Sequence, residues 1–209
     1  MELKIKVCGM REEANIQALS QLQPDLMGFI FYPASKRFVG LDFNQQMLKK
    51  IHHQIIKTGV FVNAHQNEVL EFSKLYGFKA VQLHGEESPE FCAEVKKEGF
   101  LILKAFGVNE DFNFEQLKPY EPFVDYFLFD TKVDAYGGSG KTFDWRILEN
   151  YNLNKPFFLS GGLSLENLEE VKRIKNPQFY GVDLNSKFEI EPGLKNIEKL
   201  KAAFKLINN

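Results

Sequence analysis

The side chains best suited to acid–base chemistry each stand at the end of a short apolar run. These side chains are Cys8, His84, Asp130 and Asp183. A thiolate or carboxylate can accept a proton and a carboxylic acid can donate one, so together they could move protons on a small substrate. Cys8 is also explained as a buried packing thiol, because free cysteine is among the most buried residue types. The fold decides whether these ends meet.

Eight apolar runs, several rich in Val, Ile and Phe, predict β-strands. They cover residues 3–8, 26–32, 57–63, 79–84, 100–106, 125–131, 155–160 and 178–183. Helical patterns lie between them, one beginning at an N-cap Ser88 followed by Pro89 and another beginning at Ser164. Apolar residues at steps of three and four over 194–207 predict a last helix. Pro119 and Pro122 leave room for only a short helix in 107–124.

Eight strands that alternate with helices predict parallel pairing through right-handed crossovers. We therefore expect an α/β fold, a single (β/α)8 TIM barrel with outer helices, over residues 1–209 as one catalytic domain. An open doubly wound sheet is the alternative, but it usually has fewer strands. In the barrel, the carboxyl ends of all strands share one face, and that face carries the chemistry.

Strand alternation predicts which of these side chains face the barrel axis. With residues 3, 5 and 7 toward the helices, Lys6 and Cys8 point inward. The same parity turns Gln82 and His84 inward together, and Asp130 with them. A thiol, an imidazole and a carboxylate are therefore expected to meet at one mouth.

Two glycine-rich segments are typical of phosphate-binding loops. Residues 136–145 (YGGSGKTFDW) and 160–164 (SGGLS) follow strands, and glycine lets backbone amides approach an anion. Residues 135–142 (AYGGSGKT) also nearly match a nucleotide-binding P-loop, but Ala135 stands where that motif requires glycine. A flexible glycine linker is a third reading. We favour a phosphate or substrate loop over both.

The composition excludes several classes of partner and site. A formal net charge of −2 argues against a nucleic-acid surface, and no apolar run approaches the roughly 20 residues that span a bilayer. The first residues lack the apolar segment of a signal peptide, and two cysteines are too few for a disulfide framework. We therefore expect a cytoplasmic protein. The four histidines show no zinc-like spacing, so no metal site is expected.

Seven motifs, in order, make the sequence resemble one enzyme family. They are KVCGM, GFIFYPASKRFV, GVFVN, VQLHGEE, DTKVDAYGGSGKTFDW, LSGGLSLENL and EPGLKN, and they span nearly the whole chain. The family that they resemble is phosphoribosylanthranilate isomerase, a (β/α)8 barrel of tryptophan biosynthesis. The resemblance implies an Amadori rearrangement of N-(5-phosphoribosyl)anthranilate to 1-(2-carboxyphenylamino)-1-deoxyribulose 5-phosphate. It also implies that no cofactor takes part.

The resemblance also assigns roles to individual residues. It implies that Cys8 is the general base, that Asp130 is the general acid and that Arg37 holds the anthranilate carboxylate. The residues implied near the phosphate, the sugar and the reacting atoms are Gly161, Gly162, Ser186, Asp183 and His84. The chain departs from the family's usual SSG after Asp183, since Asn185, Ser186 and Lys187 stand there.

The implied chemistry sets requirements on two pKa values. Asp130 must be protonated near neutrality, and we expect a closed site with apolar neighbours such as Phe127 and Phe129 to raise its pKa. Cys8 must be a thiolate, which a cation at Lys6 would favour. Lys6 is equally explained by a pair with a carboxylate inside the barrel.

Other functions compete with this one. A different sugar-phosphate isomerase on the same barrel is the nearest, although the histidine-pathway relative resembles a two-aspartate design and Cys8 argues against it. A non-catalytic phosphate-binding barrel and a nucleotide hydrolase are further alternatives. The expected partner is a phosphorylated small molecule, and we expect a monomer rather than a dimer.

Overall fold

The computed structural model describes residues 2–40, 42–131 and 143–208, and it is a closed barrel of eight parallel strands. Neighbouring strands pair in chain order, and β1 closes the barrel on β8. The predicted (β/α)8 barrel is therefore confirmed, and each predicted strand is found with its ends shifted by at most two residues. The strands are β1 Lys4–Cys8, β2 Leu26–Ile30, β3 Ile56–Phe61, β4 Ala80–Leu83, β5 Leu101–Val108, β6 Tyr126–Thr131, β7 Phe157–Leu159 and β8 Phe179–Leu184.

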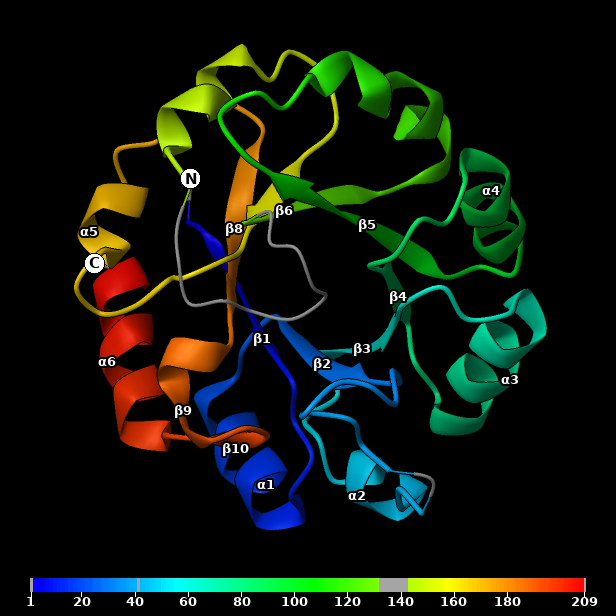
Figure 1. The fold of residues 1–209 in the computed structure, drawn as a ribbon. Helices are drawn as coiled ribbons and strands as arrows, with labels where there is room; N and C mark the ends of the chain where they lie inside the picture. Colours follow the sequence, from blue (N-terminus) through cyan, green and yellow to red (C-terminus); the bar gives the residue numbers. More distant parts are fainter. Residues whose placement is uncertain (1, 41, 132–142, 209) are drawn as a thin grey trace.

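Helices surround the strands on the outside (Figure 1). The α-helices are α1 Glu13–Leu22, α2 Gln45–Lys49, α3 Gln66–Tyr76, α4 Pro89–Lys97, α5 Leu168–Val171 and α6 Ile197–Asn208. The 3₁₀ helices are η1 Phe114–Phe123, η2 Trp145–Asn150 and η3 Ser186–Phe188. The predicted N-cap of α4 is confirmed, because the Ser88 side chain accepts a hydrogen bond from the Phe91 amide.

Three segments differ from the sequence-based expectation. The helix expected from Ser164 is wrong in its start and length, since α5 begins at Leu168 and has four residues. The segment around Pro119 and Pro122 is a ten-residue 3₁₀ helix, because proline lacks the amide that an α-helix interior needs. Residues 189–195 form an unpredicted antiparallel hairpin, β9 Glu189–Glu191 and β10 Leu194–Lys195, which turns through a Gly193 with φ of 92°.

The core has two layers, which confirms the predicted parity. The larger layer lies between strands and helices and contains Val7, Phe127 and Phe129. Inside the barrel, a smaller apolar cluster comprises Leu26, Ala80, Leu103, Ala105, Leu128 and Phe158. Polar side chains of the same inward parity, such as Lys6 and Gln82, are also buried. The barrel thus has an apolar floor below a polar mouth.

Candidate active site

A pocket opens at the carboxyl ends of the strands and has a volume of about 760 Å³, including the part open to solvent. Eight residues that the sequence predicted for the site line it, and they come from the ends of β1, β4, β6 and β8 and from the connections after β2, β7 and β8. They are Cys8, Arg37, His84, Asp130, Gly161, Gly162, Asp183 and Ser186. The geometry brings the whole predicted set together, while the role of each residue stays a prediction.

Cys8 is the last residue of β1 and is 3% exposed. Gly28 of β2 lies beside it, and a Cβ at position 28 would stand 2.8 Å from the Cys8 Sγ atom. Because Gly28 has no side chain, the Cys8 thiol can occupy this space. Burial raises the pKa of the Cys8 thiol, and the positive charge of Lys6 lowers it in part.

Lys6 pairs with a carboxylate inside the barrel. Its Nζ atom lies 2.9 Å from Asp183 Oδ2, and both side chains are buried. Burial lowers the pKa of Lys6, but the charges and hydrogen bonds of Asp183 and Cys8 together outweigh it, and the pKa lies above its usual value. The predicted pair with a carboxylate is therefore confirmed, and the paired ammonium also opposes part of the rise in the Cys8 pKa. Asp183 Oδ1 is buried without a hydrogen-bond partner among the described residues, so it can accept one from a ligand.

Asp130 follows the apolar part of β6 and faces the pocket. Burial raises the pKa of Asp130 to about 6, while a hydrogen bond from the Thr131 amide to Oδ1 opposes the shift. The direction and the expected burial in a closed site agree with the sequence expectation, but the named apolar neighbours are wrong. Phe127 and Phe129 pack in the layer between strands and helices, because alternate residues of a strand face opposite sides.

His84 stands next to Asp130 and is held by Gln82. The Gln82 Nε2 atom lies 2.8 Å from His84 Nδ1, and His84 Nε2 lies 3.6 Å from Asp130 Oδ2. Burial, with the charges of Lys104 and Lys6, lowers the pKa of His84 to about 3. The imidazole is therefore neutral near pH 7, with Nδ1 at the Gln82 amide and Nε2 facing Asp130.

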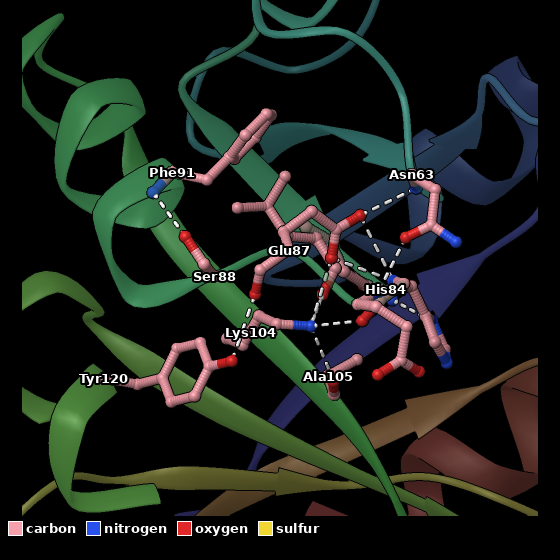
Figure 2. Close-up of polar contacts among 12 residues, drawn as sticks. Asn63, His84, Glu87, Ser88, Phe91, Lys104, Ala105 and Tyr120 are labelled. Carbon is pink, nitrogen blue, oxygen red and sulfur yellow. Dashed lines mark hydrogen bonds and ion pairs between the residues drawn. The ribbon is translucent and has the colours of Figure 1, made fainter.

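A second buried ion pair lies behind His84 (Figure 2). The Lys104 ammonium lies 3.1 Å from Glu87 Oε2, and it also donates to the carbonyls of Leu83, Gly85 and Ala105. Glu87 Oε1 accepts from the Asn63 amide. These bonds tie β5 to the connections after β3 and β4. The ion pair therefore fixes the backbone that carries His84. All three N–H donors of the Lys104 ammonium are used in these bonds.

Gly161 and Gly162 follow β7 at the predicted phosphate position. Gly161 has φ of 84°, and a Cβ there would lie 2.5 Å from the Thr131 amide nitrogen, so only glycine fits. No long helix follows these amides, because Asn167 closes the loop by accepting from the Ser164 amide and donating to the Gly162 carbonyl. The other predicted glycine loop, residues 136–145, lies outside the described residues up to position 142, as does the P-loop-like stretch 135–142.

Arg37 lines the pocket, and sequence reasoning missed its protein partner. Its guanidinium binds Glu189 of β9, and Glu189 Oε1 in turn lies 2.6 Å from Lys195 Nζ of β10. Lys195 also donates to Asn185, which lies in the segment where the chain departs from the family's usual sequence. The turn residues Pro192 and Gly193 were the available signal for this hairpin.

Two further searches of the structure bear on its possible ligands. In the part of the chain that the structure describes, no three His, Cys, Asp or Glu side chains are arranged to hold a metal ion. Among the helices of that same part, none is long and apolar enough to cross a membrane.

Comparisons with known proteins agree on one family. A family model described as N-(5'phosphoribosyl)anthranilate (PRA) isomerase matches residues 5–206. A relative from Parabacteroides distasonis, named N-(5'-phosphoribosyl)anthranilate isomerase, is 50% identical over 94% of this chain and 90% of its own. The crystal structure of the phosphoribosyl anthranilate isomerase from Thermotoga maritima covers 98% of both chains with a TM-score of 0.88 and 33% identity. A further isomerase structure, in complex with reduced 1-(o-carboxyphenylamino)-1-deoxyribulose 5-phosphate, covers 98% of both chains with a TM-score of 0.85 and 29% identity.

Proposed function

The chain belongs to the N-(5'-phosphoribosyl)anthranilate isomerase family, and we infer that it catalyses the rearrangement of N-(5'-phosphoribosyl)anthranilate to 1-(2-carboxyphenylamino)-1-deoxyribulose 5-phosphate in tryptophan biosynthesis. It is an isomerase that works by general acid–base catalysis. The observation that carries this inference is the meeting of Cys8 and a carboxyl group with a pKa of about 6, Asp130, in one pocket.

Asp130 is the general acid in this proposal. It protonates the furanose ring oxygen, the bond from that oxygen to the anomeric carbon breaks, and the nitrogen lone pair forms an iminium ion. A pKa near 6 leaves part of the Asp130 population protonated at neutral pH, which an ordinary aspartate does not achieve. In this proposal the neutral His84 carries its proton on Nε2, which faces the carboxyl group, and supports the carboxylate that remains after transfer.

Cys8 is the general base. Its thiolate removes the proton from the neighbouring sugar carbon, and the electron pair of that bond neutralises the iminium ion to give an enolamine. The enolamine then tautomerises to the ketose. Lys6 favours the thiolate, and the unpartnered Asp183 Oδ1 accepts a hydrogen bond from a sugar hydroxyl.

The two ends of the substrate carry negative charge, and the pocket offers a partner for each. The phosphate binds at the amides of Gly161 and Gly162 and at the Ser186 side chain. The anthranilate carboxylate binds to Arg37, whose planar guanidinium can hold it through two parallel hydrogen bonds.

Three further properties belong to this proposal. The described exposed surface has two large apolar side chains, Leu75 and Ile190, which supports a monomer, although a related isomerase from Thermotoga maritima is described as dimeric. Cys8 and Cys92 are both free and buried, which suits a reducing cytoplasm. The closed barrel is one catalytic domain in this proposal. Light scattering of the purified protein tests the monomer.

The activity is tested by following the loss of phosphoribosylanthranilate fluorescence with purified protein. We expect turnover without any added metal or cofactor and in the presence of a chelator. A folded preparation that binds the product but leaves the fluorescence unchanged would contradict the proposal.

A further inference from the structure

Glu189 grips one edge of the Arg37 guanidinium. Arg37 Nε lies 2.9 Å from Oε1 and 3.0 Å from Oε2 of Glu189, and Arg37 Nη2 lies 2.6 Å from Oε2. The side chains are 12% and 5% exposed. A bidentate pair of this kind fixes the plane of the guanidinium as well as its position.

The end edge of the same guanidinium, which Glu189 does not occupy, is available to a ligand. Within residues 2–40, 42–131 and 143–208, Arg37 Nη1 has no hydrogen-bond partner, and Arg37 lines the pocket. The Arg37 stem is confined as well, because a Cβ on Gly9 would lie 2.7 Å from Arg37 Cδ. The end edge, made by Nη1 and the second hydrogen of Nη2, therefore has a set direction.

Lys195 holds Glu189 from behind. Its Nζ atom lies 2.6 Å from Glu189 Oε1 and 2.6 Å from Asn185 Oδ1, and the Gly193 amide donates to the same Glu189 oxygen at 3.0 Å. Burial raises the pKa of Glu189, but the bonds and charges of Arg37 and Lys195 outweigh it and the pKa lies below its usual value. Two cations and one anion leave the cluster with a net charge of +1. An Arg37–Glu189 pair alone would be neutral and would attract a carboxylate less.

We propose that Glu189, braced by Lys195, is a positioning residue that aims the free edge of Arg37 at the carboxylate on the substrate's aromatic ring. This rests on the proposed binding of that carboxylate by Arg37. Glu189 thereby sets the preference for a ring that bears a carboxylate, although it touches no substrate atom itself. The Glu189 carboxylate repels the substrate carboxylate, but the orientation that Glu189 gives to Arg37 contributes more to binding than this repulsion costs.

Two ligands separate positioning from a general structural effect. One is the product, and the other is 1-(phenylamino)-1-deoxyribulose 5-phosphate, which keeps the ring, sugar and phosphate but lacks the carboxylate. Dissociation constants are measured by calorimetry for the wild type, Glu189→Gln, Arg37→Ala and the double variant. Glu191→Gln, an exposed residue on the same strand, is the matched control.

We expect Glu189→Gln to weaken product binding about tenfold and Arg37→Ala to weaken it about 10²-fold, with the carboxylate-free ligand unchanged in both. Glu189→Gln should add nothing on the Arg37→Ala background, and Glu191→Gln should leave both ligands unchanged. The sign is informative, because removal of a negative charge by itself would tighten the binding of an anion.

Three results would overturn the proposal. Unchanged or tighter product binding in Glu189→Gln, with Arg37→Ala still selective, would leave the role of Arg37 intact and remove that of Glu189. Equal weakening of both ligands would make Glu189 a structural residue. If Arg37→Ala affects both ligands alike, the proposed carboxylate site itself fails and Glu189 has nothing to aim.

Discussion

The two groups proposed to transfer protons, Cys8 and Asp130, occupy halves of the pocket that differ in their charge. Around Cys8 stand the cations Lys6, Arg37 and Lys195, and their charges act on the thiol or are acted on by it. Beside Asp130 stands a neutral His84. The cation that lowers the pKa of that histidine most, Lys104, is enclosed by Glu87 and three carbonyls.

Burial acts on both groups in the same direction, so it cannot by itself make one an acid and the other a base. It raises the pKa of Asp130 to about 6, which suits an acid, and it also raises the pKa of Cys8, which does not suit a base. Cations on the Cys8 side oppose the second effect. The comparison indicates that the position of the cations relative to each group, rather than depth in the barrel, divides the two proposed roles.

The largest effect is expected from Cys8→Ser. A serine hydroxyl is far harder to deprotonate than a thiol, so turnover should fall about 10³-fold or more while product binding is kept. Cys8→Asp should recover part of the activity, because a carboxylate can act as a base. Steady-state kinetics measure both.

Cys92→Ala is the control for that experiment. Cys92 is buried in α4, where burial raises its pKa to about 12, and its loss should leave turnover near normal. Normal turnover of Cys8→Ser would show that Cys8 is a packing thiol, and that the two halves of the pocket do not divide the roles of base and acid.

The next effect is on stability, from Lys104→Met. This change leaves the Glu87 carboxylate buried without its ammonium, which costs about 3–5 kcal/mol. Urea denaturation measures the loss, and Lys74→Met, which breaks the exposed pair with Glu98, should change stability by less than about 1 kcal/mol. A Lys104→Met protein of normal stability would show that this cation is not a structural one.

Asp130→Asn should lower turnover about 10²-fold or more with little change in product affinity. The amide keeps the shape of the side chain but has no proton to transfer to the ring oxygen. Rapid-mixing kinetics with a single turnover of substrate separate this step from binding. Near-normal turnover of Asp130→Asn would show that Asp130 is not the general acid.

The smallest effect is the pH dependence of stability that Asp130 contributes. Its folded-state pKa of about 6 lies above the unfolded value of 3.8, so its contribution is fully present below pH 3.8 and is lost as the pH rises through about 6. Relative to Asp130→Asn, the wild type should lose about 2 kcal/mol between pH 4 and pH 7, less than the full shift implies because the side chain is 18% exposed. Parallel denaturation curves at the two pH values measure it. A constant difference would mean that burial does not set this pKa.

Much of the barrel and its mouth could be predicted from local sequence. The alternation of apolar runs with helical patterns sets the strand order, and the period of two places Cys8 and His84 toward the axis. The end of β6 places Asp130 in the same pocket. These features depend on neighbouring residues, and that is why they are visible in the sequence.

What escaped prediction depends on contacts between distant residues. Arg37 and Glu189 are 152 positions apart, and nothing around either one indicates the other. The delayed start of α5 depends on the Asn167 side chain, which competes with the helix for the loop's backbone groups. Phe127 and Phe129 were expected beside Asp130, but the strand parity already used for Cys8 could have shown that their rings face the other side of β6.

The space beside the thiol links two positions in the evolution of this enzyme. A methyl group at position 28 would displace the Cys8 Sγ atom, so Gly28→Ala is expected to be harmful in an enzyme that keeps Cys8. In a Cys8→Ala background the same substitution meets less obstruction, although that protein lacks the proposed base. Position 28 is thus free to vary only after the function that restricts it is gone, and a lineage that keeps the thiol has no single-step route away from this glycine.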